Sequence, residues 1–451
     1  MPHAEHLVND PALPPEPSVQ AHAEDPLAGF FTHLANLPAT HHRRIGLLLM
    51  QVGAAAALAA LCLGMAVMHM AFGLAALGML LARPPLHRLP GFWLATAFAA
   101  WQLLSVLTVL ALHRHPHPLG GVGMMDSWVA LYVAQVGFAE ARVRMWACRA
   151  LLATSAAAVV VALLQFTIGL GGGPPFHIAP PPLGERFQHS TGFAPVHLTL
   201  AFTMAMVSLV FLHLPAVDAT AGRARRWCGL ALATVGLLAA NARSSFLAVS
   251  AGVGAGLGGG RGWRGLATGT ATAVVLVAAF SAYTWLLAPI HILEVARGDD
   301  GRLAIWRTTA SLIADAPLLG TGGPEAYKDA YRARYPELAL HDASGTAKEA
   351  PDAHNSHLAI AAEHGVPAAL LHAAWIAALL IAAFRSRRAQ PQRWALAGAL
   401  ITTYLVAGQF ENLAGHTATS YVLCTTLGLC LASSRPQPGD QRAAEAAAPA
   451  S

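Results

Sequence analysis

Charged residues are scarce in this sequence. They make up 11% of its 451 residues, less than half of the share of about 25% that soluble globular proteins carry. Hydrophobic residues make up 55%. They come in uncharged runs of roughly 15 to 25 residues, the length at which a helix crosses a bilayer core. The composition does not fit a soluble domain of this size and predicts an integral membrane protein.

Alternating polar and apolar residues are also rare. The apolar runs contain few of the alternating segments of about ten residues that build a membrane barrel. Only helices and closed barrels span a bilayer, because backbone groups there must satisfy their own hydrogen bonds. We therefore predict an all-α, polytopic membrane protein.

Metal-binding patterns are weak. The five cysteines form no CxxC motif, so their spacing indicates neither a zinc nor a redox site. His113, His115 and His117 alternate around Pro116, which makes a poor rigid ligand set, and a solvated turn is the better interpretation. We expect no metal and no other cofactor.

The net charge of +5 does not predict a nucleic-acid partner. Basic residues lie mostly in short clusters between apolar runs, where they orient the chain in a membrane. The expected surroundings are therefore the lipid bilayer.

Twelve membrane spans are predicted from the apolar runs. Residues 45–82 and 227–257 are each interpreted as a tight hairpin, because splitting both keeps most arginines of the short connections on one side. That side is the cytoplasm, and it holds both termini. The spans are residues 45–65, 67–82, 92–112, 124–138, 150–170, 193–214, 227–240, 245–257, 266–290, 358–384, 394–410 and 417–431.

The predicted organisation has five parts. Disordered cytoplasmic tails flank the membrane region, and a long outer loop divides nine transmembrane helices from the last three. This loop holds both lysines of the protein, and we expect it to fold as a lid and to carry chemistry. The parts are residues 1–44, 45–290, 291–355, 356–433 and 434–451.

A helix is predicted to begin at Arg302 within the outer loop. Pro317 and the glycines of LLGTGGPEAY end it. Its apolar face is expected to contain Leu303, Trp306, Ala310 and Ile313.

Three arginines lie on the predicted outer side at or near membrane depth, where a charge is costly and usually has a task. They are Arg186, Arg243 and Arg302. Together they would suit a pyrophosphate, because a guanidinium binds phosphate oxygens in pairs. Each arginine also has a purely structural interpretation. The side chain of Arg243 would extend to the membrane interface, and Arg186 would lie at the rim of a loop. Arg302 would pair with Asp299 or Asp300.

The segment PDAHNSHLAIAAEHG leads from the outer loop into the tenth predicted span. One of its histidines is a candidate general base, because imidazole, with a pKa of about 6.5, accepts and returns protons near neutral pH. The alternative is a histidine that caps or packs at the start of a helix.

Several segments resemble the O-antigen ligase and polymerase superfamily. The signature region of that superfamily resembles two segments of this sequence, GRLAIWRTTASLIADAPLLGTGGPEAY and the later HNSHLAIAAEHGVPAA. The superfamily's short Ser-Arg hairpin resembles NARSSFLAVSAG. GERFQHSTGFAPVHLTLA resembles the outer Arg-then-Gly-Phe element. The resemblance covers residues from about 186 to 365.

The resemblance implies a fold like that of the GT-C membrane glycosyltransferases. It places the pyrophosphate-binding arginines at Arg186, Arg243 and Arg302, and the essential histidine at His354. Asn355, Glu363 and Trp306 are expected to support them.

The implied activity is that of an O-antigen ligase in the bacterial inner membrane. It would transfer polysaccharide from undecaprenyl pyrophosphate to lipid A–core on the periplasmic side, in one inverting, metal-independent displacement. An O-antigen polymerase or a protein O-oligosaccharyltransferase would share the donor, and the modest outer loop favours the ligase. A polyprenyl-linked glycan transporter, from a different class, would need the arginines but not His354.

Overall fold

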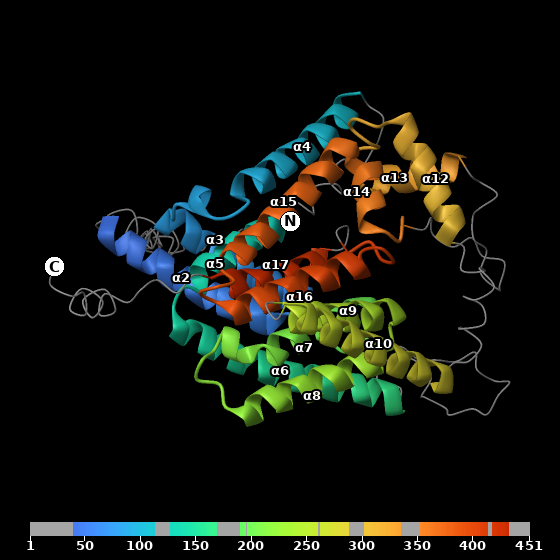
Figure 1. The fold of residues 1–451 in the computed structure, drawn as a ribbon. Helices are drawn as coiled ribbons and strands as arrows, with labels where there is room; N and C mark the ends of the chain where they lie inside the picture. The colour runs from blue at the N-terminus through green and yellow to red at the C-terminus, as the bar shows by residue number, and fades with distance from the viewer. Residues whose placement is uncertain are drawn as a thin grey trace, which may run out of the picture.

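The protein is all-α in its described part. The computed structural model describes residues 39–112, 127–168, 190–194, 196–259, 262–287, 302–334, 352–413 and 417–432. These residues form 15 α-helices and no β-strand (Figure 1). The helices are α2 (Ala39–Ala60), α3 (Met65–Ala82), α4 (Phe92–Ala111), α5 (Ser127–Gly137), α6 (Ala141–Ile168), α7 (His197–Leu212), α8 (Arg223–Ala240), α9 (Arg243–Gly258), α10 (Gly262–Leu287), α12 (Arg302–Asp315), α13 (Pro324–Arg334), α14 (Ser356–His364), α15 (Val366–Arg385), α16 (Pro391–Ala407) and α17 (Thr417–Leu431).

Membrane-spanning helices dominate this fold. Among the described residues, 6 helices are long and apolar enough to cross a membrane, namely those at Thr40–Ala60, Met65–Ala82, Phe92–Ala111, Ala141–Thr167, Trp263–Thr284 and Val366–Arg385. Shorter apolar helices lie at His197–Leu212 and Ala418–Leu431. The chain is therefore a multi-pass membrane protein. Each predicted apolar run overlaps a helix of its own, but the count of twelve spans stays a prediction.

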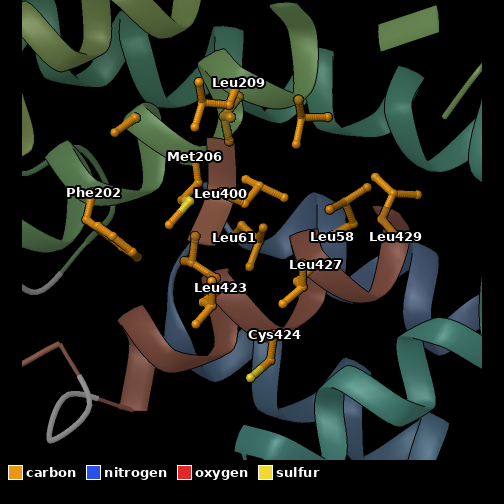
Figure 2. Close-up of a cluster of buried hydrophobic side chains, with 14 of the residues drawn as sticks. Leu58, Leu61, Phe202, Met206, Leu209, Leu400, Leu423, Cys424, Leu427 and Leu429 are labelled. Carbon is orange, nitrogen blue, oxygen red and sulfur yellow. The ribbon is translucent and has the colours of Figure 1, made fainter. Parts of the chain in front are cut away.

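Helices α7 and α17 lie at the centre of the bundle. Residues 199–211 of α7 are all buried, as expected for a helix that is apolar on every side. Figure 2 shows Leu58 of α2, Met206 of α7, Leu400 of α16 and Leu427 of α17 in one buried cluster. Because lipid tails are as apolar as leucine, such clusters stabilise the bundle through close packing.

Glycines allow the hairpin of α2 and α3 to pack with touching backbones. A Cβ atom added at Gly53 would lie 2.7 Å from the backbone nitrogen of Ala75, and one at Gly78 would lie 2.6 Å from the carbonyl oxygen of Gly46. Small residues at such contacts are typical of helix pairs in membranes. The prediction that residues 45–82 form two helices is confirmed.

Helices α12, α13 and α14 form a separate cap at one end of the bundle, beside α4 and α15 (Figure 1). The cap has its own small apolar core, made by Ile305, Leu312, Tyr327, Tyr331, Ala353, Ala359 and Ala362. The cap comes from the predicted outer loop and the start of the predicted tenth span. The rest of the predicted outer loop, residues 288–301 and 335–351, lies outside the described residues. The predicted tails do too, apart from residues 39–44.

The run predicted as the tenth span, residues 358–384, is not one continuous helix. The chain breaks at Gly365, between α14 and the membrane helix α15. Gly365 has φ 86°, and a Cβ atom there would collide with the carbonyl oxygen of Leu318. Continuous hydropathy hid this break, because the apolar residues of α14 pack against protein. Ala359 and Ala362 belong to the core of the cap, and Ile360 packs with Phe98 and Ala368.

The helix predicted from Arg302 is confirmed as α12. Its predicted apolar face is right for Trp306 and Ile313, which pack against the core of the cap, and wrong for the other two residues. Leu303 is 56% exposed and Ala310 is exposed, whereas Ile305, Thr308, Thr309 and Leu312 are buried. Thr309 can lie on the buried face because its Oγ1 donates to Ile305 O at 2.8 Å and lies 2.7 Å from the hydroxyl of Tyr327. Hydrophobicity alone does not reveal such satisfied polar residues.

Candidate functional site

A cavity of about 410 Å³ opens where the cap meets the membrane bundle. We call it the site cavity. Segments far apart in the sequence contribute to its walls. The described residues that line it are His197, Leu198, Asn241, Ala242, Arg243, Ser244, Leu247, Arg302, His354, Phe410 and Glu411.

The turn between α8 and α9 brings Arg243 to this cavity. Asn241 ends α8 in the left-handed conformation, with φ 47° and ψ 47°, which asparagine adopts more readily than most residues. Ala242 is the N-cap of α9, and Arg243 is its first residue. The guanidinium is therefore at a helix end, where it faces the cavity.

Arg302 reaches the same cavity from the first position of α12. Its Nη2 lies 3.7 Å from Glu411 Oε1, an ion-pair distance longer than a hydrogen bond. The sequence left open a local pair with Asp299 or Asp300, and both of these lie outside the described residues.

His354 stands in a constrained segment before α14. Its φ of 43° is uncommon for a residue other than glycine. The backbone N–H of His354 donates to Asp352 Oδ1 at 2.7 Å, which stabilises this turn. The next residue, Asn355, caps α14 by accepting from the N–H groups of His357 and Leu358. The predicted capping role therefore belongs to Asn355 and not to His354.

Hydrogen bonds fasten this segment to the chain after α16. The backbone N–H of Ser356 donates to Gly408 O at 2.7 Å, and Ser356 Oγ donates to Glu411 O at 3.0 Å. Leu413 N–H in turn donates to Ser356 Oγ at 2.9 Å. These bonds hold His354 next to Glu411.

Glu411 lies at the centre of the polar groups of the site. Its Oε2 is 3.7 Å from His354 Nδ1, and its Oε1 accepts from Ser244 Oγ at 3.3 Å, beside Arg302. The sequence analysis missed this residue. One signal was present, since Glu411 is the only acidic residue in 394–431, and a lone carboxylate between apolar runs is a functional candidate.

Two carboxylates face the Nδ1 side of the His354 ring, because Asp352 Oδ1 also lies 3.3 Å from Nδ1. The interaction with Glu411 is the largest cause that raises the pKa of His354, and the charge of Asp352 acts in the same direction. Burial and the charge of Arg302 oppose this rise. The ring therefore holds a proton more strongly than a free histidine does.

The three residues expected to support the site do not line it. Asn355 acts as the cap of α14, and Trp306 packs against the small core of the cap. Glu363 is buried in α14, where its backbone oxygen accepts from the N–H groups of Gly322 and Gly323. Burial raises the pKa of Glu363 to about 8, with the charge of Asp352 acting in the same direction.

Arg186 lies outside the described residues, and so do His113, His115 and His117. Within the part of the chain that the structure describes, no group of three or more His, Cys, Asp or Glu side chains could hold a metal ion. The structure thus brings together Arg243, Arg302 and His354, whose chemical roles stay predictions.

An apolar groove of about 200 Å³ adjoins the site cavity between α9 and α10. Arg243 and Leu247 line both spaces. Phe246, Val277 and Phe280 form its apolar wall, and the rings of Phe246 and Phe280 stack with centroids 4.4 Å apart. The groove therefore connects a guanidinium with a surface suited to hydrocarbon.

Residues 228–373 match a family model described as O-Antigen ligase. No curated protein matches the chain in sequence. The matched segment contains Arg243, Arg302 and His354, the three predicted site residues that line the site cavity. This segment of the chain is therefore similar to the O-antigen ligase family.

Proposed function

We propose that the protein is an O-antigen ligase that transfers polysaccharide from undecaprenyl pyrophosphate to lipid A–core. The family match supports a glycosyltransferase-like membrane enzyme of the O-antigen ligase or polymerase type, with a lipid-linked substrate. The observation that carries the proposal is the convergence of Arg243, Arg302 and His354 on one cavity.

The two arginines provide the binding site for the pyrophosphate. They approach the cavity from the membrane bundle and from the cap, so that their guanidinium groups act from two directions. Arginine binds phosphate oxygens in pairs and keeps its charge at any relevant pH. Such fixed charges stabilise the negative charge that grows on the leaving pyrophosphate in the transition state.

The groove between α9 and α10 supports a polyprenyl-linked donor. An isoprenoid chain in this groove would contact Phe246, Val277 and Phe280, while its pyrophosphate reached Arg243. A donor bound in this way places its sugar in the site cavity, which borders the groove at Arg243 and Leu247.

His354 is the proposed general base. Two carboxylates face Nδ1, which favours the tautomer with the proton on Nδ1 and leaves the lone pair of Nε2 to accept a proton. The acceptor hydroxyl gives its proton to Nε2 as its oxygen attacks the anomeric carbon. The bond from that carbon to the phosphate oxygen breaks, and the pyrophosphate leaves with the electron pair. One such displacement inverts the anomeric carbon.

The leaving pyrophosphate already activates the anomeric carbon, so the proposed reaction requires neither a nucleotide nor a metal. We place this chemistry on the periplasmic side of the bacterial inner membrane and assign the chain a GT-C-like architecture. Arg186 is the proposed third pyrophosphate ligand by its position in the resembling motif.

Reconstitution tests the function directly. The full chain in liposomes receives undecaprenyl-pyrophosphate-linked glycan and lipid A–core, and the products are separated on a gel. Glycan joined to lipid A–core supports the ligase. A longer lipid-linked glycan would instead indicate a polymerase, and movement of unmodified glycan across the membrane would indicate a transporter.

A further inference from the structure

A second cavity, of about 390 Å³, lies at the opposite ends of the helices that build the site cavity. It is enclosed by the end of α7, the start of α8, the end of α9 and the start of α16, and its lining includes His213, Arg226, Leu257 and Gln392. Helices of 16 to 18 residues separate the two cavities, a length of roughly 25 Å. The second cavity is therefore a distinct space on the other side of the bundle.

Two residues that line the second cavity each have a nitrogen atom without a partner. Arg226 Nε and His213 Nε2 are both buried, and neither has a hydrogen bond to any described residue. The two side chains line the same cavity. The lining that the structure describes contains no Asp or Glu. A positive charge with no carboxylate in this lining is costly, and an anion in the cavity would offset the charge of Arg226.

Neighbouring arginines at this end of the bundle differ from Arg226, because protein groups satisfy them. Arg225 forms an ion pair with Asp218 at 2.5 Å. Arg393 donates to the carbonyl oxygens of Ala216 and Ala432, and Arg144 donates to that of Val217. These arginines hold the fold together, whereas the guanidinium of Arg226 lies over the Trp227 ring, and its Nε has no hydrogen bond to any described residue.

Tryptophans mark the depth of the second cavity. Trp227 follows Arg226 and is 56% exposed, and Trp263 at the start of α10 is 76% exposed. Exposed tryptophans at helix ends are typical of the interface between bilayer and water. Leu212 and Leu257 provide apolar lining. The cavity can therefore contact a lipid headgroup with its polar residues and the adjoining part of the acyl chains with its leucines.

The start of α16 adds to the attraction for an anion. Its N-cap, Gln390, makes no side-chain hydrogen bond to the helix, and the N-terminal end of a helix carries partial positive charge. Gln392, in the first turn of α16, lines the cavity. Gly256 lets α9 pack closely against the imidazole, because a Cβ atom there would lie 2.7 Å from His213 Nε2.

We propose that the second cavity binds the phosphate of an anionic phospholipid beside the side chains of Arg226 and His213, which line it. The lipid comes from the membrane leaflet on that side, opposite the site cavity. Its phosphate is attracted by the charge of Arg226 and by the start of α16, and its acyl chains leave along the apolar lining. The site would be occupied irrespective of the glycan substrates.

The test uses the full chain, purified in detergent and stripped of lipid. Thermal unfolding is followed while phosphatidylglycerol, phosphatidylethanolamine or inorganic phosphate is added, and native mass spectrometry counts the lipids that stay bound. We expect phosphatidylglycerol to raise the unfolding temperature saturably, and phosphatidylethanolamine to have a much smaller effect.

Arg226→Gln is expected to weaken phosphatidylglycerol binding about tenfold, the effect of losing one charge-assisted contact. Arg223→Gln is the matched control, because Arg223 is exposed one turn earlier on α8 and should bind as the wild type does. His213→Leu provides a second variant with a similar loss. Equal binding by the wild type and all three variants would overturn the proposal. A saturable effect of inorganic phosphate without one of phosphatidylglycerol would overturn the lipid assignment.

Discussion

At the residue scale, the surroundings of His354 define an experiment on the base. His354→Asn is expected to lower transfer by roughly two to four orders of magnitude, the usual contribution of general acid–base catalysis. Asparagine tolerates the left-handed backbone of this position, so the variant removes the base and keeps the turn. His354→Ala should lose transfer equally. Donor binding, measured separately with labelled lipid-linked glycan, should survive in both variants, because the arginines remain.

The dependence of transfer on pH tests the same role through Glu411. A base must be neutral to accept a proton, so turnover falls as pH drops through the pKa of His354, which lies above its ordinary value mainly because of Glu411. Glu411→Gln removes that cause and lowers the pKa. The acidic limb of the pH profile should therefore move to lower pH in this variant.

Asp352→Asn is the graded control for this shift. Asp352 also raises the pKa of His354, but less than Glu411 does, so its variant should move the acidic limb in the same direction by a smaller step. An unchanged limb in both variants would mean that His354 only orients the acceptor and takes no proton.

The arginines are tested by charge and by shape. Arg243→Ala and Arg302→Ala should each lower donor use by one to two orders of magnitude, since a charge-assisted phosphate contact contributes about 1.5 to 3 kcal/mol. Lysine at either position should restore only part of the rate, because it lacks the planar fork. Arg387→Ala is the control, since Arg387 follows α15 at the opposite end of the bundle. Wild-type transfer by both alanine variants would reduce these arginines to structural anchors.

At the element scale, the break between α14 and α15 depends on Gly365. Gly365→Ala should destabilise the protein by about 1 to 3 kcal/mol, the usual cost of a strained backbone conformation, with the contact to Leu318 O adding to it. Gly398→Ala on α16 is the control, because no heavy atom lies within 4 Å of the added Cβ. Alanine favours a helix there. Thermal unfolding in detergent should separate the two variants, and similar unfolding temperatures would contradict this account of the break.

Hydropathy predicted the helices well, because a bilayer permits few other structures for an apolar run. It failed where the surroundings were protein rather than lipid. The residues of α14 join a cap, although their apolar run continues into α15. In α12, Thr308 and Thr309 are buried and Leu303 is exposed, because hydrogen bonds and neighbouring helices decide its orientation. Such tertiary contacts do not appear in the composition of a single helix.

At the scale of the whole molecule, the site joins segments that are distant in sequence. The sequence predicted Arg243, Arg302 and His354 one at a time, from their depth and from motifs. It did not predict Glu411, which lies 57 residues beyond His354 and reaches it only because Ser356 fastens the two segments together. A charge network of this kind depends on the packing of the complete bundle.

Orientation in the membrane is the remaining property of the whole molecule. The arginine bias predicts that the connection between α15 and α16 is cytoplasmic and that the cap is periplasmic. Ala389 in that connection and Ala333 in α13 are both exposed. Each is changed to cysteine in a Cys228→Ser background, because the other described cysteines are buried. Spheroplasts are then treated with a maleimide that does not cross membranes.

Ala333→Cys should be labelled in intact spheroplasts, and Ala389→Cys only after the membrane is opened with detergent. Three arginines precede Ala389 by one to four residues, and moving such a cluster to the outside opposes the positive-inside bias. Because the site cavity borders the cap and the second cavity borders the start of α16, one labelling pattern orients both. The reverse pattern would place His354 on the cytoplasmic side, and the periplasmic ligation proposed for it would then be wrong.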